Sequence, residues 1–289
     1  GSGVGDLLDE IVQQLKKAFE TSSKNYDDHL KIGFVGKPNV GKSSLINALI
    51  KQERLLVHEK AGTTRSTVEV PFIYGDKKFL LHDTAGIKKK WKSDSDVAAA
   101  AAMQSLRTMS SVDVVFFVLD ASSPIASQDQ TIAGQIEEQE LKVIVLLNKI
   151  DLISENEQQT LLDRISHYLP KLWWAPVVLV SAKDALGLKK MLQLATEISE
   201  NAKKEIEQET LDRFLDRILK NHFPGKMDDQ REPKVYSFKQ IKADPPIFKL
   251  TVNFPAALAK GWKNLFEKQF RLEFGFEGSP IVIRYAKKS

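Results

Sequence analysis

The segment Gly36–Ser43 constrains the fold more than any other stretch of this 289-residue chain. It reads Gly-Lys-Pro-Asn-Val-Gly-Lys-Ser and matches the pattern of a phosphate-binding loop. A β-rich run, residues 31–36, leads into it, and a helical pattern follows it. A strand, a glycine-rich turn and a helix in this order surround an anion with backbone N–H groups and a helix N-terminus. The sequence therefore predicts an α/β fold that binds a phosphate group.

The pattern of residues 31–200 extends this prediction to a whole domain. Short β-rich runs alternate with longer helical patterns, which is typical of a mostly parallel sheet flanked by helices. The last three β-rich runs are apolar nearly throughout, as expected of strands buried on both faces. The predicted strands are 31–36, 68–74, 78–82, 112–119, 142–147 and 176–180, the second and third forming a hairpin around Gly75 and Asp76.

Beyond residue 200 the sequence predicts a second, smaller α+β domain. A charged stretch, residues 201–209, is expected to begin a helix, and two alternating runs then predict strands. A helix and a last strand complete the order α-β-β-α-β. The predicted segments are a linker helix in 1–30, a phosphate-loop domain in 31–200 and the small domain in 201–289.

The N-terminal residues resemble a later part of the same chain. Gly3–Ile11 aligns with Gly187–Ala195, the start of the last helix of the larger domain. One interpretation is that residues 3–20 are the final helix of an upstream copy of that domain. The alternative is an ordinary amphipathic helix.

Composition limits the kinds of site, compartment and partner that this chain can have. It has no cysteine, which excludes disulfides and thiolate metal sites. The longest apolar run without a proline, Val97–Met103, is too short to cross a bilayer, so a cytoplasmic protein is expected. Residues 204–289 hold 17 Lys/Arg against 12 Asp/Glu, so the net positive charge lies in the small domain.

The phosphate loop assigns roles to two of its residues. Lys42 is predicted to reach the β- and γ-phosphates of a nucleotide, and the Ser43 hydroxyl is predicted to ligate Mg²⁺. The residues predicted to surround the phosphates are Gly36, Lys37, Pro38, Asn39, Val40, Gly41, Lys42, Ser43 and Ser44.

Asn148-Lys-Ile-Asp151 predicts which base is bound. The Asp151 carboxylate can accept hydrogen bonds from N1–H and the 2-amino group of guanine, donors that adenine lacks. Such a pairing discriminates strongly because a buried carboxylate left unpaired is costly. GTP and GDP are therefore predicted rather than ATP. The residues predicted at the base are Asn148, Lys149, Asp151, Ser181, Ala182 and Lys183.

Two further segments are predicted to respond to the γ-phosphate. In Asp83-Thr-Ala-Gly86, the aspartate is expected to hold Mg²⁺ through water and the Gly86 N–H to sense the phosphate. Thr64 is expected to complete the Mg²⁺ shell. The predicted catalytic residues are Lys42, Thr64, Asp83 and Gly86, and the second segment contributes Asp83, Thr84, Ala85, Gly86 and Ile87 to the nucleotide site.

These motifs, in this order, resemble the Der (EngA) family of bacterial ribosome-assembly GTPases. The resemblance spans residues 3–289 and includes Gly-Thr-Thr-Arg65 and the closing segment Gly275–Pro280. It implies a second GTPase domain followed by a KH-like domain, with the chain's own upstream GTPase domain, ribosomal RNA and large-subunit proteins as partners. Ser66 departs from the family, in which Asp usually follows the arginine, so no role is carried over to it.

Ile87 constrains the mechanism of hydrolysis. Many GTPases carry a glutamine there to orient the attacking water, and isoleucine has no group that could do so. The resemblance implies a potassium ion near the phosphates, held partly by Asn39. The alternative for Asn39 is a turn residue with a local hydrogen bond.

The small domain carries a charge pattern that suits RNA. Residues 234–289 hold 11 Lys/Arg against 4 Asp/Glu, with Tyr236, Phe238, Trp262 and Tyr285 among them. The alternative is that most of these aromatic residues form the core. Gly275-Phe-Glu-Gly278 looks like the clamp loop of a KH domain, but it precedes a strand and contains an acidic residue, which favours a tight turn.

Two other functions remain open on the sequence. One is a GTP-gated binding module for RNA or protein whose hydrolysis is negligible. The other is an Era-like ribosomal RNA-binding GTPase, which would need a helix, a clamp loop and a second helix that the sequence does not display.

Overall fold

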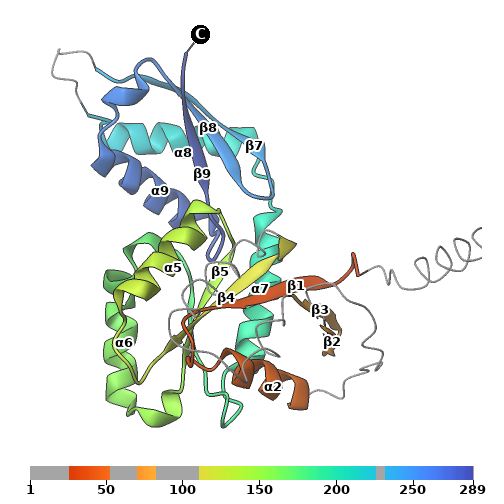
Figure 1. The fold of residues 1–289 in the computed structure, drawn as a ribbon. Helices are drawn as coiled ribbons and strands as arrows, with labels where there is room; N and C mark the ends of the chain where they lie inside the picture. Colours follow the sequence, from red (N-terminus) through yellow and green to blue (C-terminus); the bar gives the residue numbers. More distant parts are fainter. Residues whose placement is uncertain (1–25, 53–69, 83–110, 226–231, 289) are drawn as a thin grey trace, which may run out of the picture.

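The computed structural model describes residues 26–52, 70–82, 111–225 and 232–288. The predicted N-terminal helix at residues 3–20 lies outside them. The larger part is a six-stranded sheet of order β2-β3-β1-β4-β5-β6, parallel except for the β2–β3 pair (Figure 1). Its strands are β1 (Leu30–Val35), β2 (Val70–Tyr74), β3 (Lys77–Leu81), β4 (Val114–Asp120), β5 (Val143–Asn148) and β6 (Val177–Leu179). The predicted α/β fold is confirmed.

Helices cover both faces of this sheet. Apolar side chains of α2 and α7 pack on one face, and those of α5 and α6 pack on the other. The central strand β4 shows why the strands are so apolar, because Phe116 points into one layer and Phe117 into the other. The helices are α2 (Lys42–Gln52), α5 (Ser127–Glu138), α6 (Glu155–Tyr168) and α7 (Leu188–Ala202), with short 3₁₀ turns η2 (Ile150–Leu152) and η3 (Pro170–Leu172).

The predicted hairpin is present at the edge of the sheet. Tyr74, the last residue of β2, pairs with Lys77, the first residue of β3, so Gly75 and Asp76 form the two-residue turn. Gly75 has a φ of 61°, the positive value that the first central residue of a type II′ turn requires.

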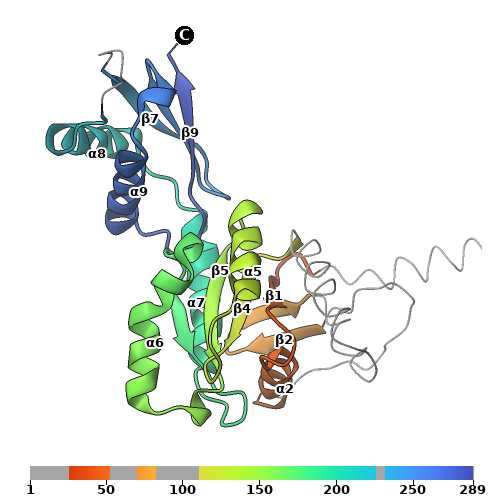
Figure 2. The same ribbon diagram turned by 60° about the vertical axis from the view of Figure 1, so that its left-hand side comes forward.

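A second sheet with two helices forms the C-terminal part. Its order is β7-β8-β9, antiparallel between β7 and β8 and parallel between β8 and β9. Both helices lie on one side of it (Figure 2). The elements are α8 (Gln208–Asn221), β7 (Val235–Lys242), β8 (Ile247–Val252), η4 (Pro255–Ala257), α9 (Lys260–Phe274) and β9 (Val282–Lys287), which confirms the order α-β-β-α-β.

Helix α8 begins within residues 201–209, as predicted, but only near the end of that stretch. Helix α7 continues to Ala202, whose side chain is buried with that of Ile198 one turn earlier. Residues 203–207 are not helical, and α8 begins at Gln208. The first two residues of the charged stretch therefore belong to the end of α7, where Ala202 is buried.

The turn after α9 joins the two parts of the molecule. Gly275–Gly278 forms a turn before β9, as predicted, and its Phe276 side chain is buried in the second core. The Val143 N–H donates to the Gly278 carbonyl at 2.8 Å, and the Gly278 N–H donates to the Trp174 carbonyl at 3.2 Å. The turn is therefore hydrogen-bonded to both the first residue of β5 and the segment before β6.

Charged side chains add to this contact. Lys142 pairs with Asp244 at 2.8 Å, and Arg271 lies over the Trp174 ring, 5.0 Å from its centroid. The buried Arg271 also donates to the carbonyls of Phe276 and Ser279 at 2.9 and 2.8 Å. These contacts fix the turn from both sides.

Candidate functional site

The predicted site loops meet at one edge of the larger sheet. Strands β1, β5 and β6 run parallel, so the loops that follow them emerge at the same edge. The loops are Gly36–Ser43, Asn148–Asp151 and Ser181–Lys183. Direct hydrogen bonds connect all three loops, so the structure brings these predicted residues together.

The phosphate loop requires glycine at two positions. Gly36 and Gly41 have φ values of 143° and 100°, which side-chain-bearing residues rarely adopt. A Cβ at Gly36 would overlap the Val118 carbonyl, and a Cβ at Gly41 would overlap the Asn148 amide. The loop therefore packs closely on β4 and β5 and leaves no room for side chains at these points.

Helix α2 begins directly at the loop and presents an anion-binding end. Its first turn contains no acidic residue. The Lys42 ammonium donates to the carbonyls of Gly36 and Lys37, each at 2.6 Å. Its positive charge is thus held above the loop, where it adds to the field of the helix N-terminus. Ser43 follows in the first turn and is half-buried.

Of the other loop residues, some pack into the core and others are exposed to solvent. Val40 is buried in the core beneath the loop, and Pro38 is half-buried. Asn39 is exposed with a φ of 64°, and Ser44 is exposed at the rim of a cavity. The potassium-binding role of Asn39 stays a prediction.

Asn148 connects the loops on the two sides of the site. It is the last residue of β5, and its side chain is buried. Its amide Nδ2 donates to the Val40 carbonyl at 2.8 Å, and its Oδ1 accepts from the Ala182 N–H at 3.2 Å. One side chain therefore sets the position of the phosphate loop relative to the 181–183 loop.

Asp151 is held by the loop after β6. The Ser181 hydroxyl donates to its Oδ1 at 2.8 Å, and the Lys183 ammonium lies 4.0 Å from its Oδ2. The Asp151 side chain is 12% exposed and that of Lys183 is 76% exposed. A largely shielded carboxylate with a fixed orientation is suited to bind a ligand that offers two N–H donors.

Lys149 is oriented by an aspartate at the end of β4. Its ammonium lies 2.5 Å from Asp120 Oδ2. Burial raises the pKa of Asp120, but hydrogen bonds from Lys149 and Ser122 outweigh it, so the pKa lies below its usual value. Asp120 was absent from the predicted site. Its place at a strand end on the ligand-binding edge is a signal that could have identified it.

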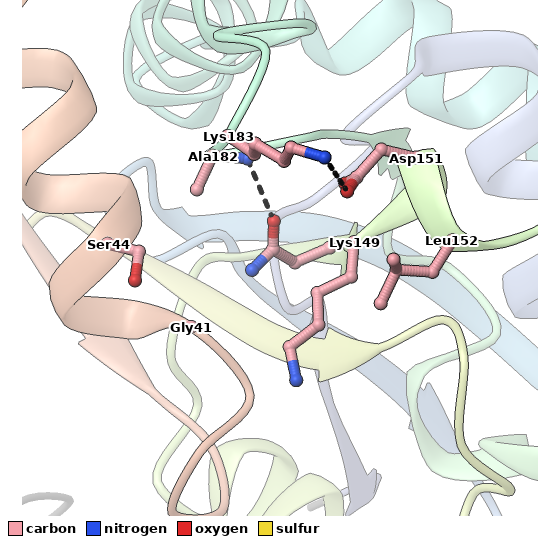
Figure 3. A pocket seen from close by; sticks show the side chains of 8 residues that line it. Gly41, Ser44, Lys149, Asp151, Leu152, Ala182 and Lys183 are labelled. Carbon is pink, nitrogen blue, oxygen red and sulfur yellow. Dashed lines mark hydrogen bonds and ion pairs between the residues drawn. The ribbon is translucent and has the colours of Figure 1, made fainter.

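The three loops line an open cavity of about 380 Å³. In Figure 3 Asp151 and Lys183 lie on one side of it, and Gly41 and Ser44 lie on the other. Cavities of this size hold small-molecule ligands. The lining residues are Gly41, Ser44, Asn148, Lys149, Asp151, Leu152, Ala182 and Lys183. The phosphate loop with the Lys42 ammonium at one end and the Asp151 carboxylate at the other fit a phosphorylated ligand with a donor-bearing base.

A second unpredicted aspartate supports the phosphate loop. Lys37 Nζ lies 2.7 Å from Oδ2 of Asp129 on α5, a carboxylate that is 1% exposed. The same oxygen accepts from the Ala126 N–H at 2.9 Å. No sequence signal distinguishes Asp129 from the other polar residues of α5. It is recognised only by its burial.

The remaining predicted site residues are not in the described part of the chain. Thr64 and residues 83–87, namely Asp83, Thr84, Ala85, Gly86 and Ile87, lie outside it. Among the residues that the structure describes, no helix has the length and apolar character needed to cross a bilayer.

Comparison with known proteins supports the interpretation of both parts. Residues 31–149 match the family described as 50S ribosome-binding GTPase, and residues 205–285 match the family described as KH-domain-like of EngA bacterial GTPase enzymes. The GTPase Der of Staphylococcus carnosus is 36% identical over 293 residues, an alignment that covers 100% of this chain and 66% of the relative. The chain belongs to the Der (EngA) family. The GTPase Der of Levilactobacillus brevis is 35% identical with the same coverage.

The chain spans about two thirds of the length of these Der relatives. A solved structure of Era with MgGDPNP and nucleotides 1506–1542 of 16S ribosomal RNA is 25% identical to it. That alignment covers 90% of this chain and 93% of the Era chain, with a TM-score of 0.46.

Proposed function

We propose that this chain binds GTP and GDP and hydrolyses GTP as a switch protein of bacterial large-subunit ribosome assembly. The observation that carries the proposal is the Asn148 side chain, which joins the phosphate loop to the base-side loops around one cavity. A nucleotide bound there would contact Lys42 through its phosphates and Asp151 through its base. The guanine N1–H and 2-amino donors suit the shielded carboxylate, whereas adenine presents no such pair.

Metal binding belongs to the same proposal. Mg²⁺ bound at the phosphates would neutralise the charge that develops during transfer to water. The Ser43 hydroxyl, at the start of α2, is the described residue that fits as a ligand. Thr64 and Asp83 would complete the shell, directly and through water, and the Gly86 N–H would sense the γ-phosphate.

Hydrolysis requires a water-orienting group other than residue 87, because Ile87 has no hydrogen-bonding side chain. We propose slow basal turnover that potassium stimulates, with Asn39 as part of the potassium site. The exposed position of Asn39 on the loop supports this role.

The setting of the switch is inferred from the family. The matching family is described as 50S ribosome-binding, and the C-terminal part matches a KH-like domain. Ribosomal RNA and large-subunit proteins are therefore the proposed partners, together with an upstream GTPase domain of the kind that Der proteins carry. The proposed location is the cytoplasm, where ribosomes are assembled.

The test is nucleotide exchange and hydrolysis by the purified chain. Fluorescent GDP is displaced by GTP, GDP and ATP in turn, and phosphate release is followed in potassium and in sodium buffer. We expect displacement by GTP and GDP only, and faster turnover in potassium. Failure of GTP to displace GDP contradicts the nucleotide assignment, and equal turnover in both salts removes the potassium proposal.

Turnover with and without ribosomal particles separates the two alternatives that the sequence leaves open. Negligible hydrolysis in both conditions, with intact GTP binding, would favour the GTP-gated binding module. Stimulation by the small subunit rather than the large one would favour an Era-like role.

A further inference from the structure

The second sheet carries three cations in one row across its strands. Lys239 of β7 pairs directly with Lys249 of β8, and Lys249 pairs directly with Arg284 of β9. All three residues are exposed. Neighbouring strands lie about 4.8 Å apart, so the row is about 10 Å long. Like charges directly opposite one another destabilise a sheet, so this arrangement costs stability in the isolated protein.

The acidic residues of the same region do not relieve this repulsion. Residues 234–289 contain four carboxylate side chains. Asp244 pairs with Lys142, Glu267 with Arg271 and Glu273 with Arg217, all away from the row. The fourth, Glu277, lies in the turn against the larger part. Within the described residues, no carboxylate forms an ion pair with Lys239, Lys249 or Arg284.

The row lies on the open face of the sheet. The alternate residues Phe238, Phe248 and Leu250 are buried against α8 and α9, so their neighbours in each strand point the other way. Figure 2 shows both helices on the opposite side. Ser237 and Thr251 pair beside the row and add two hydroxyl groups to the same face.

The turn that resembles a KH clamp is not free to hold RNA. Both backbone groups of Gly278 are bonded to the larger part, through Val143 and Trp174. A Cβ at Gly278 would overlap Ile198, so the turn is closely packed there. Any RNA contact by the C-terminal part must therefore use another surface.

We propose that the open face of the β7-β8-β9 sheet binds the phosphodiester backbone of RNA, through the row of Lys239, Lys249 and Arg284. This inference rests on the proposed function for its partner and goes further by naming the surface. Backbone phosphates supply the counter-charges that the protein does not, and hydroxyl groups commonly donate to phosphate oxygens.

An aromatic side chain at the end of the sheet favours RNA over an acidic peptide. Tyr236 is 39% exposed, and the amino groups of Lys288 and Lys234 lie 4.0 and 5.8 Å from its ring centroid. Exposed aromatic rings stack on unpaired bases, and the nearby lysines extend the positive surface to the same point.

The experiment compares two triple variants of the whole chain. K239Q/K249Q/R284Q removes the row, and R213Q/K260Q/K268Q removes the same three charges from exposed positions on α8 and α9. Binding of a labelled single-stranded RNA of about 15 nucleotides is measured by fluorescence anisotropy over a range of KCl concentrations. We expect the first variant to bind about tenfold or more weakly at about 100 mM KCl, with a salt slope shallower by about 2. The control is expected to stay within about twofold of the unaltered chain.

Equal weakening in both variants overturns the proposal, because it would show only a loss of net charge. Competition by poly-glutamate as effective as that by unlabelled RNA also overturns it. The melting temperature of the row variant is expected to be unchanged or higher, since repulsion is removed, so misfolding would be detected directly. Fluorescent-GDP binding is measured on each protein, so failure of the nucleotide assignment is seen separately from failure of the RNA surface.

Discussion

The Asn148 amide donates a 2.8 Å hydrogen bond to the carbonyl of Val40, a residue of the phosphate loop that is distant in sequence. The other end of the same side chain accepts from the backbone of Ala182. The two loops on either side of the cavity are therefore positioned by one buried amide group.

Replacing Asn148 by alanine is expected to speed nucleotide release. The Val40 carbonyl and the Ala182 N–H each lose a partner, and an unsatisfied buried group costs about 1–3 kcal/mol. We expect fluorescent GDP to dissociate about tenfold or more faster in a stopped-flow displacement assay. Alanine at Asn156, an exposed residue of α6, is the control. An unaltered release rate in Asn148→Ala would show that the two hydrogen bonds of Asn148 are not needed to retain the nucleotide.

Asp151→Asn is expected to change the preferred base. The amide offers a donor where the carboxylate accepts, so it matches the 2-oxo group of xanthine better than the 2-amino group of guanine. We expect weaker GDP binding and measurable binding of xanthosine diphosphate, both followed by calorimetry. Unchanged guanine preference would refute the role of Asp151 at the base.

The Lys37–Asp129 pair is expected to show strong coupling in stability. Lys37→Met leaves a carboxylate that is 1% exposed without its cation, and breaking a buried pair in this way costs about 3–5 kcal/mol. Adding Asp129→Asn removes the buried charge, so the double variant is expected to be more stable than Lys37→Met alone. Urea unfolding of the two single variants and the double variant measures the coupling. Strictly additive losses would contradict it.

The lowered pKa of Asp120 predicts a specific pH dependence. A carboxyl group whose pKa is lower in the folded chain stabilises the fold above its unfolded value of about 3.9, and this contribution is lost as pH falls through the folded pKa. The stability difference between the unaltered chain and Asp120→Asn is therefore expected to be constant above about pH 5 and to shrink below about pH 4. Urea unfolding across this range measures it. A difference that grew on acidification would have the wrong sign.

Gly278 and Gly275 provide a matched test of the contact between the two parts. Both have positive φ values, 70° and 84°, so alanine strains the backbone at either position. A Cβ at Gly278 would also overlap Ile198 and lie 3.1 Å from the Val143 carbonyl, whereas a Cβ at Gly275 meets nothing within 4 Å. We expect Gly278→Ala to lower the unfolding free energy by about 1–3 kcal/mol more than Gly275→Ala. Equal losses would mean that the close packing contributes little.

The sequence is sufficient for the architecture and for the three loops that the structure brings together. Strands buried on both faces are apolar throughout, and this pattern located β4 and β5 before the structure was known. Gly36–Ser43 and Asn148–Asp151 each have an unusual residue pattern and each lie at the end of a strand. The pattern and the position are independent signals, and both indicate a ligand-binding loop.

The supporting residues could not be identified in the same way. Asp120 is marked in the sequence only by its place at a strand end, and Asp129 is not marked at all, because the cations that give both residues their role are brought to them by tertiary folding. Contacts between residues that are distant in the sequence give these aspartates their role, and the local sequence pattern does not show such contacts.

The hydrogen bonds of the turn after α9 determine where the chain can be cut without disturbing the larger part. A cut at residue 203 would separate the two sheets along the sequence, but it would leave the Val143 N–H and the Trp174 carbonyl without the Gly278 groups that satisfy them. It would also uncover Ile198, which lies against Gly278. The smallest self-sufficient version of the larger part thus includes a piece of backbone from near the far end of the chain. A boundary in the sequence is not a boundary in the folded molecule.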